Sequence, residues 1–194
     1  MSVISKSSLG QFRNTTRATR LSASDSLKSF KNESRQNKVT IFLSHKHDEI
    51  EELDAAISFL KRFDIDVYVD WLDERMPAAT SGKTAVRIKQ KIKENNKFIF
   101  LATEGAIASK WCNWELGYGD SLKYIDKIAL LPIRNDGRTY TGSEYMQIYP
   151  SIEYMDGTDR NLAGQPIGEG YYVLNPADDD GNRSFVTLRY WLMR

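Results

Sequence analysis

From residue 39 onward, short apolar runs alternate with stretches in which apolar residues recur every three or four positions. Short apolar runs are typical of buried parallel strands, and the wider spacing is typical of amphipathic helices. The runs predict strands over residues 39–43, 65–69, 98–101 and 128–131, the last closed by Pro132. The spacing predicts helices over residues 48–62, 83–95 and 110–124. This alternation predicts an α/β fold, a doubly wound, flavodoxin-like parallel sheet of about five strands with helices on both faces.

Composition divides the chain into three parts. Residues 1–37 hold seven Lys or Arg against two acids, together with nine serines. They predict a basic, Ser/Arg-rich N-terminal arm, either a short helix or a disordered segment, and their makeup also suits an organellar transit peptide. Residues 38–134 form the predicted core. Residues 135–194 form an extension that completes or flanks the same domain, with a further strand over 171–174 and a strand or short helix over 184–192.

The bulk properties of the 194 residues narrow the class of protein. Hydrophobic residues make up 41%, enough for one core, and the net charge of +1 gives no sign of a nucleic acid or an anionic membrane as partner. Cys112 is the single cysteine, so an internal disulfide is impossible. No apolar run approaches the roughly 20 residues of a membrane span, and no signal-type stretch opens the chain. We therefore expect a cytoplasmic protein.

The predicted topology places a binding site before any motif is considered. Ligands of open α/β sheets bind at the carboxyl ends of the strands, where the winding direction reverses. Residues 44–48, 70–82 and 103–111 follow the first three predicted strands. We expect these three segments to meet at one crevice.

Glu115 is the strongest candidate for chemistry in the chain. Ser109 can cap the predicted helix, and Trp111 and Trp114 begin an apolar stripe that continues to Tyr118, Leu122 and Ile125. At about 100° per residue, Glu115 lies only about 40° from Trp111, within this stripe. A carboxylate on a buried face must be paired, bonded or needed for function. A structural ion pair is the alternative to a catalytic role.

The run SKWCNWEL resembles the Ser-x-Trp-Cys-x-x-Glu-Leu signature of Toll/interleukin-1 receptor (TIR) domains. The segments IFLSH, VYVDW with DERMP, FIFLATEGAIASKWCNWELGYGD, ALLPI and SEYMQIYPSIEY resemble the other conserved blocks of bacterial TIR proteins, so the resemblance covers residues 39–155. One block departs from receptor-type TIR domains, which carry Pro-Gly in the loop after the second strand. Here Pro77 is followed by Ala78. Because of this departure, the sequence resembles the bacterial TIR enzymes more than the receptor scaffolds.

The resemblance implies a stand-alone TIR enzyme, similar to the TIR component of Thoeris antiphage systems. Glu115 would be the catalytic residue of an activity that cleaves NAD+ into nicotinamide and an ADP-ribose-type product, a cyclic signalling molecule or ADP-ribose. NAD+ would be the substrate, so no cofactor and no metal are expected. Such enzymes usually self-associate, and a separate effector protein would read the product. The side chains expected around the substrate are Ser44, His45, Asp70, Trp71, Lys83, Arg87, Trp111 and Trp114.

Several alternatives stay open at this point. His45 and His47 suggest a metal, but no second cysteine or matched carboxylate pair supports one. Ser81-Gly82-Lys83-Thr84 resembles the end of a P-loop, but Pro77 stands where its first glycine is required. Lys83 and Arg87 could instead meet a pyrophosphate at a helix N-terminus, or form a solvated basic face. For the whole protein, the rivals are a non-catalytic TIR interaction scaffold and an N-deoxyribosyltransferase-like enzyme, which also uses a glutamate on a doubly wound sheet.

Overall fold

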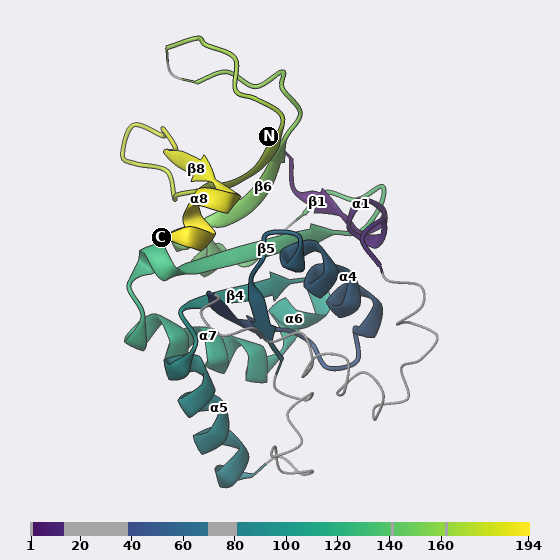
Figure 1. Ribbon diagram of the computed structural model, residues 1–194, viewed down its shortest axis with the longest axis vertical. Helices are drawn as coiled ribbons and strands as arrows, with labels where there is room; N and C mark the ends of the chain where they lie inside the picture. The colour runs from purple at the N-terminus through teal and green to yellow at the C-terminus, as the bar shows by residue number, and fades with distance from the viewer. Residues whose placement is uncertain (1, 14–38, 70–80, 141, 162) are drawn as a thin grey trace.

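The structure is a computed structural model that describes residues 2–13, 39–69, 81–140, 142–161 and 163–194 (Figure 1). Its strands are β1 (Ile4–Ser5), β2 (Thr40–Ser44), β3 (Asp66–Tyr68), β4 (Lys97–Ala102), β5 (Ile128–Arg134), β6 (Ser151–Met155), β7 (Gly170–Leu174) and β8 (Phe185–Thr187). Its helices are α1 (Lys6–Gly10), α4 (Ile50–Lys61), α5 (Gly82–Glu94), α6 (Glu104–Ala108), α7 (Lys110–Leu122) and α8 (Leu188–Met193), with 3-10 turns η2 (Ile125–Lys127) and η3 (Glu144–Ile148).

The described strands form one sheet in the order β3-β2-β4-β5-β6-β7-β8, and β1 pairs with β5. The first five strands of this order are parallel to one another, whereas β7 is antiparallel to β6 and β8 is antiparallel to β7. Counted along the chain, the parallel part has the order 2-1-3-4-5, which is that of flavodoxin-like folds. The predicted fold class is therefore confirmed. The winding direction reverses between β2 and β4, where such folds bind their ligands.

Each face of the sheet has its own core, because successive residues of a strand point to opposite faces. Ile41 and Leu43 of β2 pack with the buried residues of α1, α4 and α8. Phe42, between them, packs with the buried residues of α5, α6 and α7 on the other face. In Figure 1, α1 and α4 lie together at the right of the sheet, and α5 and α7 lie below it.

The first described residues are part of the fold. Ile4 and Ser5 pair in parallel with the end of β5, and Ser5 caps α1 by accepting from the backbone N–H of Ser8. Leu9 is 1% exposed and α1 packs against α4, where Lys6 forms an ion pair with Glu52. Residues 2–13 are therefore packed into the domain and are not part of the separate N-terminal arm predicted over residues 1–37. Residues 14–37 of that prediction lie outside the described residues, so the predicted domain boundaries stay a prediction.

Two further elements differ from the sequence-based expectation. β5 runs through Pro132, which we expected to close the strand. Pro132 is the last residue of β5 paired with β4, so the missing N–H falls where that ladder ends. The extension continues the same sheet through β6, β7 and β8, and the 184–192 segment contains both a strand and a helix. Among the helices that the structure describes, none has the length and apolar character to span a bilayer.

The packing of α1 generates a test. Replacing buried Leu9 by Ala removes apolar contacts with α4 and should lower the free energy of unfolding by about 2–5 kcal/mol. The exposed neighbour Gln11 is the matched control, and Gln11→Ala should change it by less than about 0.5 kcal/mol. Urea denaturation followed by circular dichroism measures both. Equal, negligible effects would show that residues 2–13 are a dispensable arm after all.

Candidate active site

The end of β2 and the second turn of α7 meet at a buried hydrogen bond. The Ser44 hydroxyl donates to Oε2 of Glu115 at 2.6 Å. Ser44 is 1% exposed and Glu115 is 3% exposed. The bond lies at the carboxyl end of β2, beside the point where the sheet reverses its winding. This short hydrogen bond between two buried side chains fixes the orientation of the Glu115 carboxyl group.

Local sequence explains why α7 begins where it does. Ser109 has an extended backbone, and its hydroxyl accepts from the backbone N–H of Cys112 at 3.3 Å, as expected of the predicted cap. The Cys112 thiol in turn donates to the backbone carbonyl of His45 at 3.1 Å. The first bond sets the start of α7, and the second fixes its first turn against the segment that follows β2. Glu115 lies one turn further along and therefore reaches Ser44.

The buried face of α7 is rotated relative to the predicted stripe and shares only Glu115 with it. Its fully buried residues are Cys112, Glu115, Leu116 and Gly119. A Cβ atom at Gly119 would lie 3.1 Å from the Phe98 ring, so the helix approaches β4 too closely for a large side chain there. Glu115 faces inward as predicted. The prediction was wrong for the end of the stripe, because Leu122 is 44% exposed and Ile125 is 46% exposed and lies beyond the helix.

The two tryptophans lie on the flank of this face. Trp111 and Trp114 are partly buried, and their rings stack with centroids 4.9 Å apart. The Trp114 ring also stacks on Tyr118 at 6.1 Å, and the ammonium group of Lys89 lies 5.7 Å from its centroid. Lys89 belongs to α5, so the aromatic row fills the seam between α5 and α7. Whether it also walls a substrate pocket stays a prediction.

His45 follows Ser44 directly and is 3% exposed. Its ring Nδ1 lies 3.1 Å from the backbone carbonyl of Leu43, and its ring centroid is 5.3 Å from that of His47. In the part of the chain that the structure describes, no three His, Cys, Asp or Glu side chains are grouped as a metal site would require. His45 is thus positioned beside the Ser44–Glu115 pair and turned onto its own strand.

A second polar contact joins the predicted 103–111 segment to Glu49, which lies one residue beyond the predicted 44–48 segment. The Thr103 hydroxyl, just after β4, donates to Oε2 of Glu49, which lies just before α4. The same hydroxyl accepts from the backbone N–H of Ala106 at 3.1 Å and so caps α6. Burial raises the pKa of the Glu49 carboxyl above its ordinary 4.5, and the Thr103 hydrogen bond lowers it in part. Sequence reasoning missed this contact, although Thr103 directly before Glu104 carried a cap signal.

The remaining predicted site residues are less closely placed. Lys83 is exposed in the first turn of α5, and Arg87 is partly buried one turn later. α5 packs against α7, so both cations lie on the same face of the sheet as Glu115. Ser81 caps α5 in a reciprocal capping box with Thr84, which gives its Ser-Gly-Lys-Thr run a structural role. Asp70 and Trp71 lie outside the described residues.

Comparison with known proteins agrees with this geometry. A family profile described as TIR domain matches residues 41–165, which include the β2 end, α7 and the strands between them. The chain belongs to the TIR domain family.

Two relatives of this TIR domain protein carry functional names. A protein of Bacillus cereus (strain MSX-D12), named a probable 3' cyclic ADP-D-ribose synthase, ThsB', is 28% identical over 169 residues, which cover 85% of this chain and 81% of that protein. A protein of Cytobacillus dafuensis with the provisional name cyclic ADP-D-ribose synthase TIR2 is 26% identical over 103 residues. That match covers 50% of this chain and 27% of the relative.

The Thr103–Glu49 contact of this TIR domain predicts a pH-dependent stability. The folded-state pKa of Glu49 is raised, so its ionisation costs stability as the pH rises from about 4.5 through that raised pKa. Thr103→Val removes the hydrogen bond that offsets this cost, together with a helix cap that contributes about 0.5–2 kcal/mol. The loss of unfolding free energy should therefore be larger at pH 7 than at pH 4. Urea denaturation at the two pH values measures it.

Thr103→Ser is the matched control for this prediction, because it retains the hydroxyl and should lose little stability at either pH. An identical loss for Thr103→Val at both pH values would mean that only the helix cap matters and that Glu49 is not coupled to it.

Proposed function

We propose that this protein cleaves the bond between nicotinamide and ribose of NAD+ and that Glu115 is its catalytic residue. The observation that carries the proposal is the buried Glu115 carboxylate, fixed by Ser44 at the point where the sheet reverses its winding. The names of the two TIR relatives, both cyclic ADP-D-ribose synthases, support NAD+ chemistry. We further propose that the product is an ADP-ribose-type signalling molecule in antiphage defence.

Cleavage of the nicotinamide–ribose bond is favoured by a carboxylate beside the ribose. When the C–N bond breaks, its electron pair leaves with neutral nicotinamide, and positive charge develops on the ribose ring, as in glycoside hydrolysis. An ionised Glu115 beside the ribose stabilises that charge or binds the ribose hydroxyls. Ser44 donates to one carboxylate oxygen and so holds Glu115 in one orientation. Orientation fixed before the reaction requires no rearrangement at the transition state.

The side chains around the rest of the NAD+ molecule are assigned from their positions in the fold. We propose that Trp111 and Trp114 shield the ribose–nicotinamide end from water, and that His45 borders the same end. Lys83 and Arg87 are proposed to meet the pyrophosphate at the start of α5, where helix N–H groups also favour an anion. Asp70 and Trp71 are proposed for the same crevice from their place after the second strand.

The fate of the ribosyl cation separates a hydrolase from a cyclase. Attack by water gives ADP-ribose and releases one proton. Attack by an adenine nitrogen or a hydroxyl of the same molecule gives a cyclic isomer. We propose the cyclase outcome on the strength of the relatives' names, with self-association of the protein and a separate effector that binds the product. A cytoplasmic location fits the supply of NAD+.

The first test replaces Glu115 by Gln, which keeps the size of the side chain and an oxygen that can accept from Ser44. Nicotinamide release from NAD+, measured by chromatography and mass spectrometry, should fall at least about 100-fold. The melting temperature should change little. Asp120→Asn, an exposed acid on the same helix, is the control and should retain full turnover.

The same assay separates the rival functions. Turnover of NAD+ that persists in Glu115→Gln would remove Glu115 from the mechanism. Base exchange between a deoxynucleoside and a free base, without nicotinamide release, would favour the deoxyribosyltransferase alternative. A biological effect that survives Glu115→Gln would favour the scaffold.

The second test replaces Ser44 by Ala. A hydrogen bond to a charged group contributes about 1.5–3 kcal/mol, so loss of the Ser44 donor should lower kcat about 10- to 100-fold through a poorly oriented Glu115. Because Ser44 is argued to act through Glu115, KM for NAD+ should change less than kcat. Ser44→Thr keeps the hydroxyl and should recover part of the activity. A change confined to KM would instead assign Ser44 to substrate binding.

A further inference from the structure

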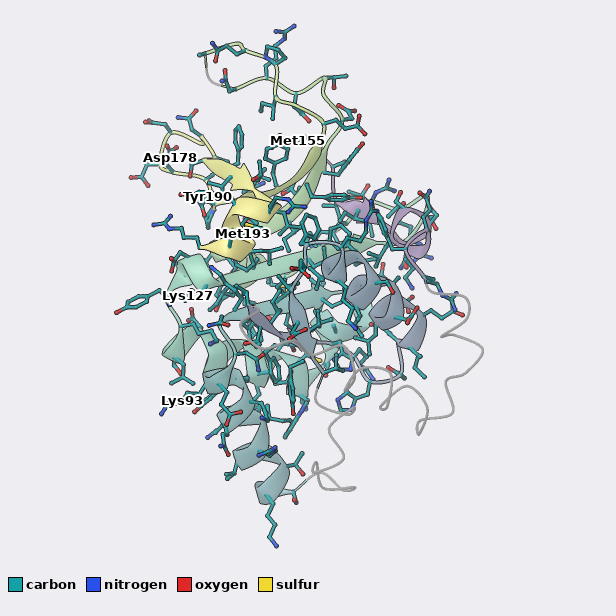
Figure 2. The ribbon with its side chains drawn as sticks, viewed as in Figure 1. Lys93, Lys127, Met155, Asp178, Tyr190 and Met193 are labelled. Atoms are coloured by element: carbon teal, nitrogen blue, oxygen red, sulfur yellow. The ribbon has the colours of Figure 1, made fainter. Side chains whose placement is uncertain are left out.

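A cavity of about 380 Å³ lies at the end of the sheet opposite Glu115, where β2 and β4 begin. It is enclosed by the last residues of α5, α7 and α8 and by the turn before β5. Its lining includes five cationic side chains, Lys93, Lys97, Lys123, Lys127 and Arg194. In Figure 2, Lys93 and Lys127 lie along the same side of the molecule as Met193, which also lines the cavity. The proposed NAD+ chemistry gives this cluster no role.

Lys97 is the most unusual member of this cluster. It is 3% exposed, although lysine is rarely buried without a counter-ion. Its ammonium group lies 4.5 Å from the centre of the Trp191 ring and 3.4 Å from the backbone carbonyl of Asp126. Within the described ranges, no carboxylate lies within ion-pair distance of Lys97. One ring face and one long carbonyl contact leave its donors incompletely used, since an ammonium group has three.

The neighbouring cations add to this charge. Lys123 is partly buried and donates to the backbone carbonyl of Asn95 at 2.6 Å. Burial lowers the pKa of both Lys97 and Lys123, and the charge of Lys127 lowers both further, whereas Asp126 raises that of Lys97. These directions describe cations held close together in a partly dry site. A bound anion would offset both the cost of burying these charges and the repulsion between them.

The negative groups around the cavity do not balance this charge. Glu94 is the only acidic side chain in the lining that the structure describes, and its two oxygens accept from Lys91 and Gln90 of its own helix. The ends of α5, α7 and α8 each contribute at most about half a negative charge. Glu94, the nearby Asp126 carboxylate and three helix ends together offset only part of the five positive charges, so a net positive charge remains for a ligand.

We propose that this cavity binds a compact phosphate anion, either inorganic or the phosphate of a nucleotide, between Lys97, Lys123 and Lys127. Its volume of about 380 Å³ leaves room for a phosphate or pyrophosphate group. Tyr124 lines the same cavity and is 80% exposed, so its ring is available to a nucleotide base. The site is independent of the proposed NAD+ cleavage, because it lies at the other end of the sheet and shares no residue with it.

The test is isothermal titration calorimetry at constant ionic strength, with the full chain carrying Glu115→Gln so that no turnover interferes. Inorganic pyrophosphate should bind, and the added double substitution Lys123→Gln/Lys127→Gln should weaken binding at least 10-fold. The control Lys110→Gln/Arg138→Gln removes the same charge elsewhere and should leave the affinity unchanged. Equal weakening by the control, or no binding before substitution, would overturn the proposal.

A third double variant separates this site from the proposed NAD+ site. Loss of pyrophosphate binding in Lys83→Gln/Arg87→Gln, with binding retained in Lys123→Gln/Lys127→Gln, would place the anion at the start of α5 and overturn the proposal. AMP titrated in parallel distinguishes the ligand sources. Tighter binding of AMP than of inorganic phosphate, lost in Tyr124→Ala, assigns the site to nucleotides, and equal affinities assign it to inorganic phosphate.

Lys97 itself provides a readout that a purely structural role would not give. Lys97→Met should keep or raise the melting temperature without ligand, because a buried cation is replaced by an apolar chain of similar length. The rise in melting temperature on adding pyrophosphate should be smaller than in the unsubstituted chain. A lower melting temperature with an unchanged pyrophosphate effect would mean that Lys97 only fastens α8 through Trp191.

Discussion

A buried carboxylate is costly, and the geometry around α7 follows from how that cost is met. Glu115 receives a hydrogen bond from Ser44, at the end of the central strand β2. For the two to meet, α7 must start at a fixed point and lie close against β4. The Ser109 cap sets the start, the Cys112 thiol fixes the first turn, and Gly119 allows the close approach. The hydrogen bond thus depends on the register of both elements.

The same constraint explains the composition of this helix. The face of α7 toward the sheet carries Cys112, Glu115, Leu116 and Gly119, and none of the aromatic residues of the helix lies on it. The aromatic residues are displaced to the flank, where they stack on one another and under Lys89 of α5. In the TIR signature, the cysteine and the glutamate therefore bond to the end of β2 and the residue after it, while the two tryptophans fill the space between α5 and α7. The side of the helix on which a residue of the signature lies therefore decides whether it faces the sheet or packs against α5.

Charge is divided between the two ends of the sheet. At the carboxyl ends of the strands lie Glu115 and Glu49, each bonded to a hydroxyl from another segment. At the amino ends lie lysines from α5, from β4 and from the segment between α7 and β5. Helix polarity contributes to this arrangement, because the carbonyl ends of the helices attract ammonium groups and their N–H ends attract anions. The two ends can therefore hold different ligands without competing for the same residues.

Local sequence determined most of the elements of this protein. Apolar runs located four of the five strands of the parallel core but not β6, and Ser109 marked the start of α7, because capping and burial periodicity act over a few neighbouring residues. Periodicity also indicated that Glu115 faces inward. Only the tertiary structure decided that Ser44 is its partner, that Thr103 binds Glu49, and that Lys97 and Lys123 share a cavity. These contacts join residues 26 to 71 positions apart in the chain, and their formation depends on the order of the strands and on how closely the helices pack on the sheet rather than on any local pattern.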